Sequence, residues 1–195
     1  MTTSLRQRRR LQTAREIQIA TLELTLQKRL DDVTTEEIAA AAGVSTRTFF
    51  NYYPNKEAAA IGHPPTFSEE ANEALRDGEN SLAVDLKRLL DKHMETLSQE
   101  ESVLRMIGVI LRTNEKARGI LEGFLILERI ALTKTLNERV KNEKAAAALA
   151  KAATDSVGAA IFHWENEENI SLTEAMDAVW EGLLDASRLL LASST

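Results

Sequence analysis

The residues best suited to chemistry lie together near the end of the first quarter of the chain. Over Thr46–Tyr53 the sequence reads TRTFFNYY, which offers hydroxyl, guanidinium, amide and phenol groups within two helical turns. Arg47 can bond both acceptors on a guanine edge, and Asn51 can do the same at adenine. Hydroxyls and tyrosine rings suit phosphate oxygens and sugars. These residue types indicate a surface that binds DNA.

Short helices must position these side chains. The run Thr34-Thr35-Glu36-Glu37 fits a capping box and predicts a helix from Thr34 to about Ala42. Gly43 supplies the backbone freedom of a tight turn. Ser45 or Thr46 can cap the next helix, so the sequence predicts a helix-turn-helix at about residues 34–53. A short α-hairpin inside a larger bundle is the alternative reading of the same pattern.

The flanking elements complete a small domain. A first helix from about Gln7 to Lys28 carries apolar residues three or four positions apart. Pro54 ends the second helix of the helix-turn-helix at Tyr53, since the residue before proline avoids the α region. Asn55 caps a fourth helix that stops at Gly62. Lys56 adds a cation where helix amides already favour an anion.

Charge is distributed unevenly along the 195 residues, whose formal net charge is −6. Residues 1–60 hold nine Lys and Arg against seven Asp and Glu, a net of +2, and the remainder has a net of −8. Five arginines precede the first acid, Glu16. An electropositive end on an acidic body suggests contact with a polyanion, although a solvated, frayed arm would give the same pattern.

The rest of the chain predicts helices only. No proline follows Pro65, good helix formers dominate, and no strand-like alternation is present, so the fold class is all-α. The break at Gly62–Pro65 and the polar stretch to about Asn80 mark the best boundary. We therefore expect a DNA-binding domain at 1–62 and a helical bundle at 63–195.

Composition excludes several classes of function. The chain has no Cys, which excludes disulfides and thiolate zinc sites and favours a reducing compartment. The N-terminus lacks the apolar segment of a secretory signal, and no apolar run reaches the ~18 residues of a membrane span, so we expect a cytoplasmic protein without membrane contact. No phosphate loop, nucleophile elbow or zinc-binding motif occurs, so we expect no enzyme, no metal site and no cofactor.

The helix-turn-helix stretch resembles the TetR family of one-component transcriptional regulators. The resemblance rests on Thr34-Thr35-Glu36-Glu37-Ile38-Ala39, Ala42-Gly43-Val44-Ser45, Thr48-Phe49-Phe50-Asn51-Tyr52-Tyr53 and Lys56-Glu57, and it covers about residues 10–60. One departure is Arg29, where relatives usually have a left-handed Gly that ends the first helix.

The resemblance implies roles for individual residues. Thr46, Arg47 and Asn51 correspond to base-reading positions, and Thr48, Tyr52 and Lys56 to phosphate contacts. The arginines at 6–10 resemble N-terminal extensions that reach the backbone or the minor groove. The full set of predicted DNA-binding residues is Thr35, Ser45, Thr46, Arg47, Thr48, Asn51, Tyr52, Tyr53 and Lys56.

The resemblance also implies a C-terminal domain that binds a small molecule and dimerises through its last two helices, at about 143–165 and 172–192. Predicted pocket residues, with His93 or Arg112 as the polar anchor, are His93, Met94, Leu97, Met106, Ile110, Arg112, Phe124 and Leu127. The expected function is a homodimeric repressor that a small-molecule effector releases from a near-palindromic operator. The alternative is an all-helical ligand-binding or scaffold protein that binds no operator.

Overall fold

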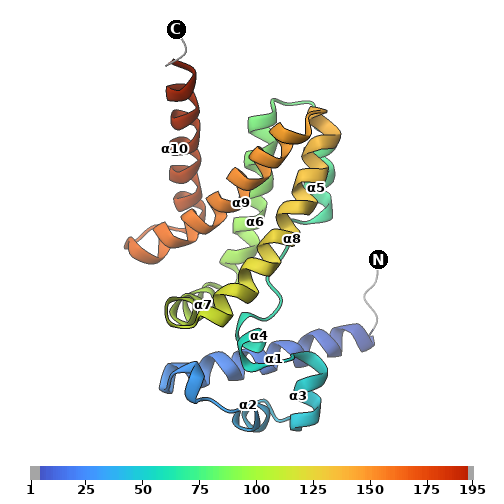
Figure 1. Ribbon diagram of the computed structural model, residues 1–195, viewed down its shortest axis with the longest axis vertical. Coiled ribbons are helices and arrows are strands. Elements are labelled where there is room, and N and C mark those ends of the chain that lie inside the picture. Colours follow the sequence, from blue (N-terminus) through green and yellow to red (C-terminus); the bar gives the residue numbers. More distant parts are fainter. Residues whose placement is uncertain (1–4, 193–195) are drawn as a thin grey trace. The chain divides into compact units, whose positions relative to one another are not determined.

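The computed structural model describes residues 5–192 and contains no strand in that part of the chain (Figure 1). Helices alone build it, as the composition predicts, so the all-α fold class is confirmed. The elements are α1 (Leu5–Gln27), the 3-10 helix η1 (Leu30–Asp32), α2 (Thr35–Ala41), α3 (Thr46–Tyr52), α4 (Lys56–Ile61), α5 (Glu69–Asp77), α6 (Leu82–Ser98), α7 (Glu101–Thr113), α8 (Glu115–Val140), α9 (Glu143–Asn166) and α10 (Leu172–Ala192).

The chain forms two compact units. The N-terminal unit combines the chain up to Pro64 with Glu101–Phe124, and the C-terminal unit combines Pro65–Glu100 with the chain from Leu125 onward. The first segment of the N-terminal unit runs to Pro64, and α7 and the beginning of α8 also pack in this unit.

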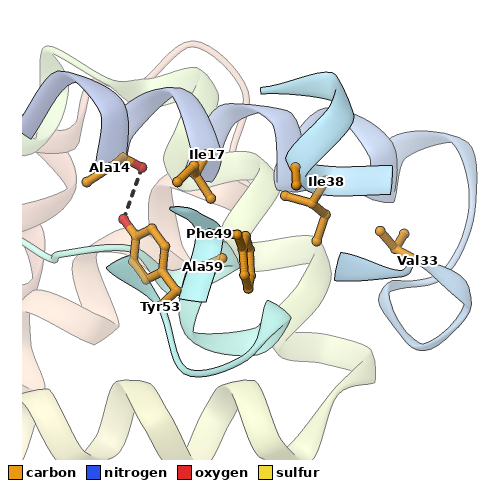
Figure 2. Packing of buried hydrophobic residues seen from close by; sticks show 8 residues of the cluster. Ala14, Ile17, Val33, Ile38, Phe49, Tyr53 and Ala59 are labelled. Atoms are coloured by element: carbon orange, nitrogen blue, oxygen red, sulfur yellow. Dashed lines mark hydrogen bonds between the residues drawn. The ribbon is translucent and has the colours of Figure 1, made fainter. Parts of the chain in front are cut away.

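A hydrophobic cluster holds the helix-turn-helix against α1 (Figure 2). Phe49 of α3 is fully buried and packs with Ile17 of α1 and Ile38 of α2. On each helix, apolar residues three or four positions apart share one face. The apolar faces of the three helices pack against one another in this cluster. The cluster fixes the orientation of α3, whose other face exposes Arg47 and Asn51 together with Phe50.

Side-chain caps define where the short helices begin. Thr34 Oγ1 accepts from the Glu37 amide at 3.2 Å, and the Glu37 carboxylate accepts from the Thr34 amide at 2.8 Å. The predicted capping box is therefore present. Ser45 caps α3 and Asn55 caps α4 through the same kind of bond. Gly43 has φ +67°, the left-handed conformation that the turn between α2 and α3 requires.

A second cluster in the N-terminal unit joins α1 and α4 to α7. Leu22, Ile61 and Ile110 are buried in it, and Met106 packs against it. Polar bonds support the same packing, since the Asn114 side chain donates to Asp31 Oδ1 at 3.0 Å and Lys116 pairs with the buried Glu57 at 3.1 Å. Helix α7 therefore supports α1 and α4.

The C-terminal unit consists of α5, α6, the larger part of α8, α9 and α10. Helix α5 lies in the stretch for which the sequence predicted only a polar linker, and Ser68 caps it. Arg139 of α8 fixes the turn after α5 by donating to the Leu75 and Asn80 carbonyls, both at 2.6 Å, and to Asp85 at 2.9 Å.

Among the described residues, α9 alone is long and apolar enough to cross a membrane by length and composition. This differs from the sequence expectation because many alanines raise the hydropathy of α9 although no unbroken apolar run occurs. Ala146, Ala153 and Trp164 are buried within the C-terminal unit, as in the core helices of soluble proteins, which pass the same test.

Candidate nucleic-acid interface

Helix α3 presents one face to solvent and buries the other. Phe49 is fully buried, whereas Arg47, Phe50 and Asn51 are exposed and Tyr52 is half-buried. The exposed guanidinium and amide are the two groups that can recognise base edges bidentately. The two predicted base readers therefore share the accessible side of a helix whose inner side is fixed by the core.

Three of the predicted contact residues, Ser45, Thr48 and Thr35, have hydroxyl groups that already form hydrogen bonds with neighbouring residues. Ser45 Oγ accepts from the Thr48 amide at 3.1 Å and lies 2.9 Å from Thr48 Oγ1. Thr35 Oγ1 donates to the Glu36 carboxylate at 3.2 Å. Thr46 and Thr48 are half-buried in the first turn of α3, beside the amide groups that favour an anion.

Tyr53 lies outside this surface, which corrects the sequence prediction. Its ring is 3% exposed, and its hydroxyl donates to the Ala14 carbonyl at 3.1 Å (Figure 2). Burial raises the pKa of Tyr53 to about 12. The side chain is thus a structural bond between α3 and α1, and its hydroxyl is not available to a phosphate.

Lys56 also has a structural contact where the sequence predicted a phosphate contact. Its ammonium donates to the carbonyls of Asp31 at 2.7 Å and Val33 at 2.9 Å. These carbonyls belong to η1 and the residue after it, so Lys56 ties the start of α4 to the loop before α2. A lysine with two fixed carbonyl partners has at most one N–H left for a ligand.

One of the two acidic residues of α2, Glu37, is paired with a lysine. Lys28 bonds the Glu37 carboxylate at 2.7 Å, and this bond, followed by those from Thr34, lowers the pKa of Glu37 to about 2. Glu37 therefore stays ionised as a helix cap, and its charge is offset by Lys28 rather than directed at a nucleic acid.

The arginines at 6–10 belong to the helix. Because α1 begins at Leu5, they form its first turns, not an extended arm. The Arg10 guanidinium lies 5.9 Å from the centre of the Tyr52 ring, within the range of a cation–π contact. The signal that could have predicted this was the helical spacing of Arg6, Arg9, Arg10 and Thr13.

The predicted pocket residues are divided between the two units. Met106, Ile110, Arg112 and Phe124 belong to the N-terminal unit, whereas His93, Met94, Leu97 and Leu127 belong to the C-terminal unit. Ile110 and Met94 are buried core residues, and Leu127 is 67% exposed. The eight residues therefore do not surround one common space within a single unit.

One of these residues has a polar atom without a partner. His93 Nδ1 is buried and unbonded within the part of the chain that the structure describes. The His93 ring packs against Phe67 with centroids 4.7 Å apart, and burial lowers the pKa of His93 to about 4. Glu128, whose carboxylate accepts from the Phe67 amide at 2.8 Å, has its pKa raised by burial. His93 is thus neutral near pH 7.

No group of three or more metal-ligating side chains occurs in residues 5–192. The arrangement that stands out is a capped pair of short helices, with the second presenting Arg and Asn to solvent. The fold and this surface define a helix-turn-helix DNA-binding protein.

Comparison with known proteins shows what the helix-turn-helix segment and the whole chain are similar to. Residues 19–58 match the model "Bacterial regulatory proteins, tetR family". The chain is 26% identical over 180 residues to a protein of Mycobacterium tuberculosis curated as "Putative mycofactocin biosynthesis transcriptional regulator MftR", covering 89% of this chain and 90% of that protein. The helix-turn-helix segment is thus similar to TetR-family regulators, as the sequence resemblance implied.

A solved structure shares the fold, and another is similar in sequence. A crystal structure from Mesorhizobium loti, of a "putative TetR-family transcriptional regulator", is 16% identical, with a TM-score of 0.52 over 91% of this chain and 98% of that one. Thermus thermophilus FadR, a TetR-family repressor solved with lauroyl-CoA, is 22% identical, with a TM-score of 0.48 over 88% and 93%.

Proposed function

We propose that this regulator is a homodimeric repressor, which a small-molecule effector releases from a near-palindromic operator. The observation that carries the proposal is the solvent-facing side of α3, where Arg47 and Asn51 are exposed above a buried Phe49. Two such helices in a symmetric dimer would enter successive major grooves about one DNA turn apart.

The proposed contacts follow from exposure and bonding. Thr46, Arg47 and Asn51 read base edges, and Thr48 and Tyr52 bond phosphates. Ser45 and Thr35 contribute chiefly through helix N-termini, because their hydroxyls already have local partners. Lys56 and Tyr53 support the domain without being direct DNA contacts.

The proposed dimer interface uses α9 and α10. Phe162 of α9 is 67% exposed, and Leu189, Leu190 and Leu191 of α10 are 70–77% exposed. A side chain added at Gly158 or Gly182 would meet nothing within 4 Å. Large exposed apolar side chains beside small residues suit close packing against a second copy of the same helices.

We place the proposed effector site in the C-terminal unit near His93. Its unbonded Nδ1 can accept a hydrogen bond from a hydroxyl or amine of a ligand, and the neighbouring Phe67 offers an aromatic wall. In the same unit, α5 and α6 line a further cavity of about 440 Å³, whose lining includes Arg88, Leu89 and Lys92 but neither His93 nor Phe67. A volume of this size suits a small metabolite.

Selection of genomic fragments on the purified protein tests whether the protein binds an operator. We expect enrichment of a near-palindromic site, and a promoter carrying that site should be silenced when the protein is present. A dimer that neutralises ~6–10 phosphates should lose about 10³–10⁵ in affinity between 50 and 200 mM salt. No enrichment, with or without a metabolite extract, would favour the ligand-binding or scaffold alternative.

Two substitutions test the assigned roles separately. Arg47→Ala should cost about 1–3 kcal/mol of operator binding and relax specificity at one base position. Lys134→Ala is the matched control, because it removes one positive charge from an exposed position on α8, outside α3 and outside the proposed α9–α10 interface. His93→Phe should abolish release by the extract while leaving operator affinity unchanged. Release that survives this change would move the effector site elsewhere.

A further inference from the structure

The segment that leads into α5 is bonded to both α6 and α8. The Phe67 ring is 5% exposed and packs against the His93 ring of α6, with centroids 4.7 Å apart. The Phe67 amide donates to Glu128 Oε1 of α8 at 2.8 Å. All three residues belong to the C-terminal unit. An imidazole of one helix and a carboxylate of another thus contact the same residue.

His93 provides a hydrogen-bond acceptor at this place. Its ring is bonded to the Thr66 backbone, and because this bond favours the protonated ring, the partner is the Thr66 carbonyl. The bonded nitrogen is Nε2, since Nδ1 is buried without a partner among the described residues. In a neutral imidazole with one N–H, the second nitrogen is an acceptor. Buried polar atoms are almost always bonded, so Nδ1 needs a donor that the described chain does not supply.

Glu128 provides a second acceptor, which carries a negative charge. Burial raises the pKa of Glu128, and the Phe67 amide is the group that lowers it. No Lys or Arg pairs with Glu128 in the part of the chain that the structure describes. A carboxylate can accept about four hydrogen bonds, so most of its capacity is open. A cation beside this carboxylate would offset the cost of its burial.

These two acceptors select the charge of a ligand. Anions are disfavoured, because they would meet the Glu128 charge without a compensating donor. A protonated primary amine supplies three N–H donors and a positive charge, and the face of an aromatic ring such as Phe67 attracts a cation of this kind. One ammonium group therefore matches the chemistry of all three side chains.

We propose that the effector is an organic amine in its protonated form, whose ammonium group binds at the site formed by His93, Glu128 and the Phe67 ring. This proposal rests on the proposed function and names the chemical class of its effector. The ammonium group donates to His93 Nδ1 and to the Glu128 carboxylate. Glu128 is thus the residue that distinguishes amines from alcohols and acids with the same carbon chain.

Calorimetric titration of the full chain with matched ligands tests this class. Butyl, hexyl and octyl chains, each carrying an ammonium, a hydroxyl or a carboxylate group, differ at each length only in the head group. We expect the best ammonium to bind about 10–100-fold more tightly than the alcohol of the same length, and the carboxylate to bind more weakly than the alcohol. An alcohol or a carboxylate that binds as tightly as the ammonium, or an ammonium series that does not bind, would overturn the proposal.

Glu128→Gln tests the assigned site. Glutamine keeps a carbonyl oxygen for the Phe67 amide but lacks the charge, so ammonium binding should weaken about 10–100-fold while alcohol binding stays unchanged. Glu122→Gln is the matched control, because it removes the same charge from an exposed position on α8. Equal ammonium affinity in Glu128→Gln and the parent would place the amine elsewhere and overturn the site. The ligand series on the parent decides the class even if the variant does not fold.

Operator release separates this proposal from the proposed function. The ammonium that binds best should release the parent from its selected duplex and should release Glu128→Gln only at about 10–100-fold higher concentration. Release by a metabolite extract, together with no calorimetric binding of any ammonium, would overturn the amine class alone. A parent that binds no duplex would contradict the proposed repressor, and the calorimetric ranking would still decide the amine site.

Discussion

Two adjacent tyrosines end the recognition helix, and their side chains lie in opposite environments. Tyr52 is half-buried beside Arg10, whereas Tyr53 is buried and bonded to the Ala14 carbonyl. A helix turns by about 100° per residue, so neighbours cannot face the same partner. Residue type alone therefore predicts two DNA contacts, whereas the fold gives one partly exposed tyrosine and one tyrosine in a structural bond.

Tyr53→Phe should destabilise the N-terminal unit by about 0.5–1.5 kcal/mol, since it removes the bond to Ala14. The pKa of Tyr53 is about 12 in the folded chain and about 10 in the unfolded chain. Between about pH 10 and 12 the unfolded chain therefore binds fewer protons than the folded chain. Stability of the parent should therefore fall as pH rises through this range, and the variant should lose that contribution. Urea unfolding at pH 8 and 11 measures both effects.

Tyr52→Phe is the matched control for this prediction. It removes the hydroxyl of a half-buried tyrosine on α3, so it should leave stability nearly unchanged and weaken DNA binding. Equal pH dependence in the parent and Tyr53→Phe would show that the buried phenol does not carry the effect.

A side chain at Gly62 should destabilise the N-terminal unit. Its backbone has φ +67° and ψ −139°, which is a region of glycine, and an added Cβ would lie 2.3 Å from the Gln18 amide nitrogen. That amide donates to the Ile61 carbonyl at 3.0 Å and so holds α4 to α1. Gly62→Ala should therefore lower the thermal midpoint by more than Gly43→Ala does.

Gly43→Ala is a close control because Gly43 has the same φ of +67° but open space where a Cβ would stand. It should cost only the left-handed strain, about 1–2 kcal/mol. Differential scanning calorimetry gives both values. A smaller loss for Gly62→Ala would mean that the Gln18 contact does not restrain α4.

At the scale of elements, α3 has seven residues and depends on its cap. Helices this short are marginal in isolation, so the Ser45 bond to the Thr48 amide and the burial of Phe49 must stabilise it together. Ser45→Ala should cost about 0.5–2 kcal/mol, and Ser45→Gly only a few tenths, because glycine is a tolerated cap. Chemical unfolding ranks the two variants.

Operator titration of the same variants separates capping from direct contact. If Ser45 acts through the cap, Ser45→Gly should keep nearly the parent affinity although it lacks the hydroxyl. An affinity loss that is equal in Ser45→Ala and Ser45→Gly, without a matching difference in stability, would assign the hydroxyl to DNA.

Elements with local signals were predictable from the sequence. Each of the caps at Thr34, Ser45 and Asn55 joins a side chain to the amide three residues later in the chain. All three caps are present. Helix α5 was missed because Pro64, Pro65 and polar residues around Ser68 resemble a linker, although Ser68 followed by two glutamates is itself a helix start.

Roles that depend on distant partners were not predictable. Lys56 resembles a free cation at a helix start, but its partners, the carbonyls of Asp31 and Val33, lie more than 20 residues earlier in the chain. Ile110 and Met106 show the helical spacing of a pocket wall, yet they pack on α1 and α4. Periodicity identifies a buried face without identifying what buries it.

At the scale of the whole molecule, charge directs DNA to one end of the sequence. Residues 1–60 have a net charge of +2 and the remaining chain a net of −8, so the polyanion is attracted to the helix-turn-helix and repelled by the rest. The arginines of the first turns of α1 concentrate this attraction beside α3. The acidic remainder also disfavours non-specific wrapping of DNA around the molecule.

Dimerisation is what should convert this local attraction into operator binding. Leu190→Glu places a charge in the proposed α10 interface and should give monomers by light scattering, with little change in monomer stability since Leu190 is 77% exposed. A monomer neutralises half the phosphates, so its salt slope should be about half that of the parent. Val84→Glu, an equally drastic change at a 44% exposed position on α6, is the control and should remain dimeric. Leu190→Glu that stays dimeric, or a monomer with the full slope, would contradict a dimer built through α10.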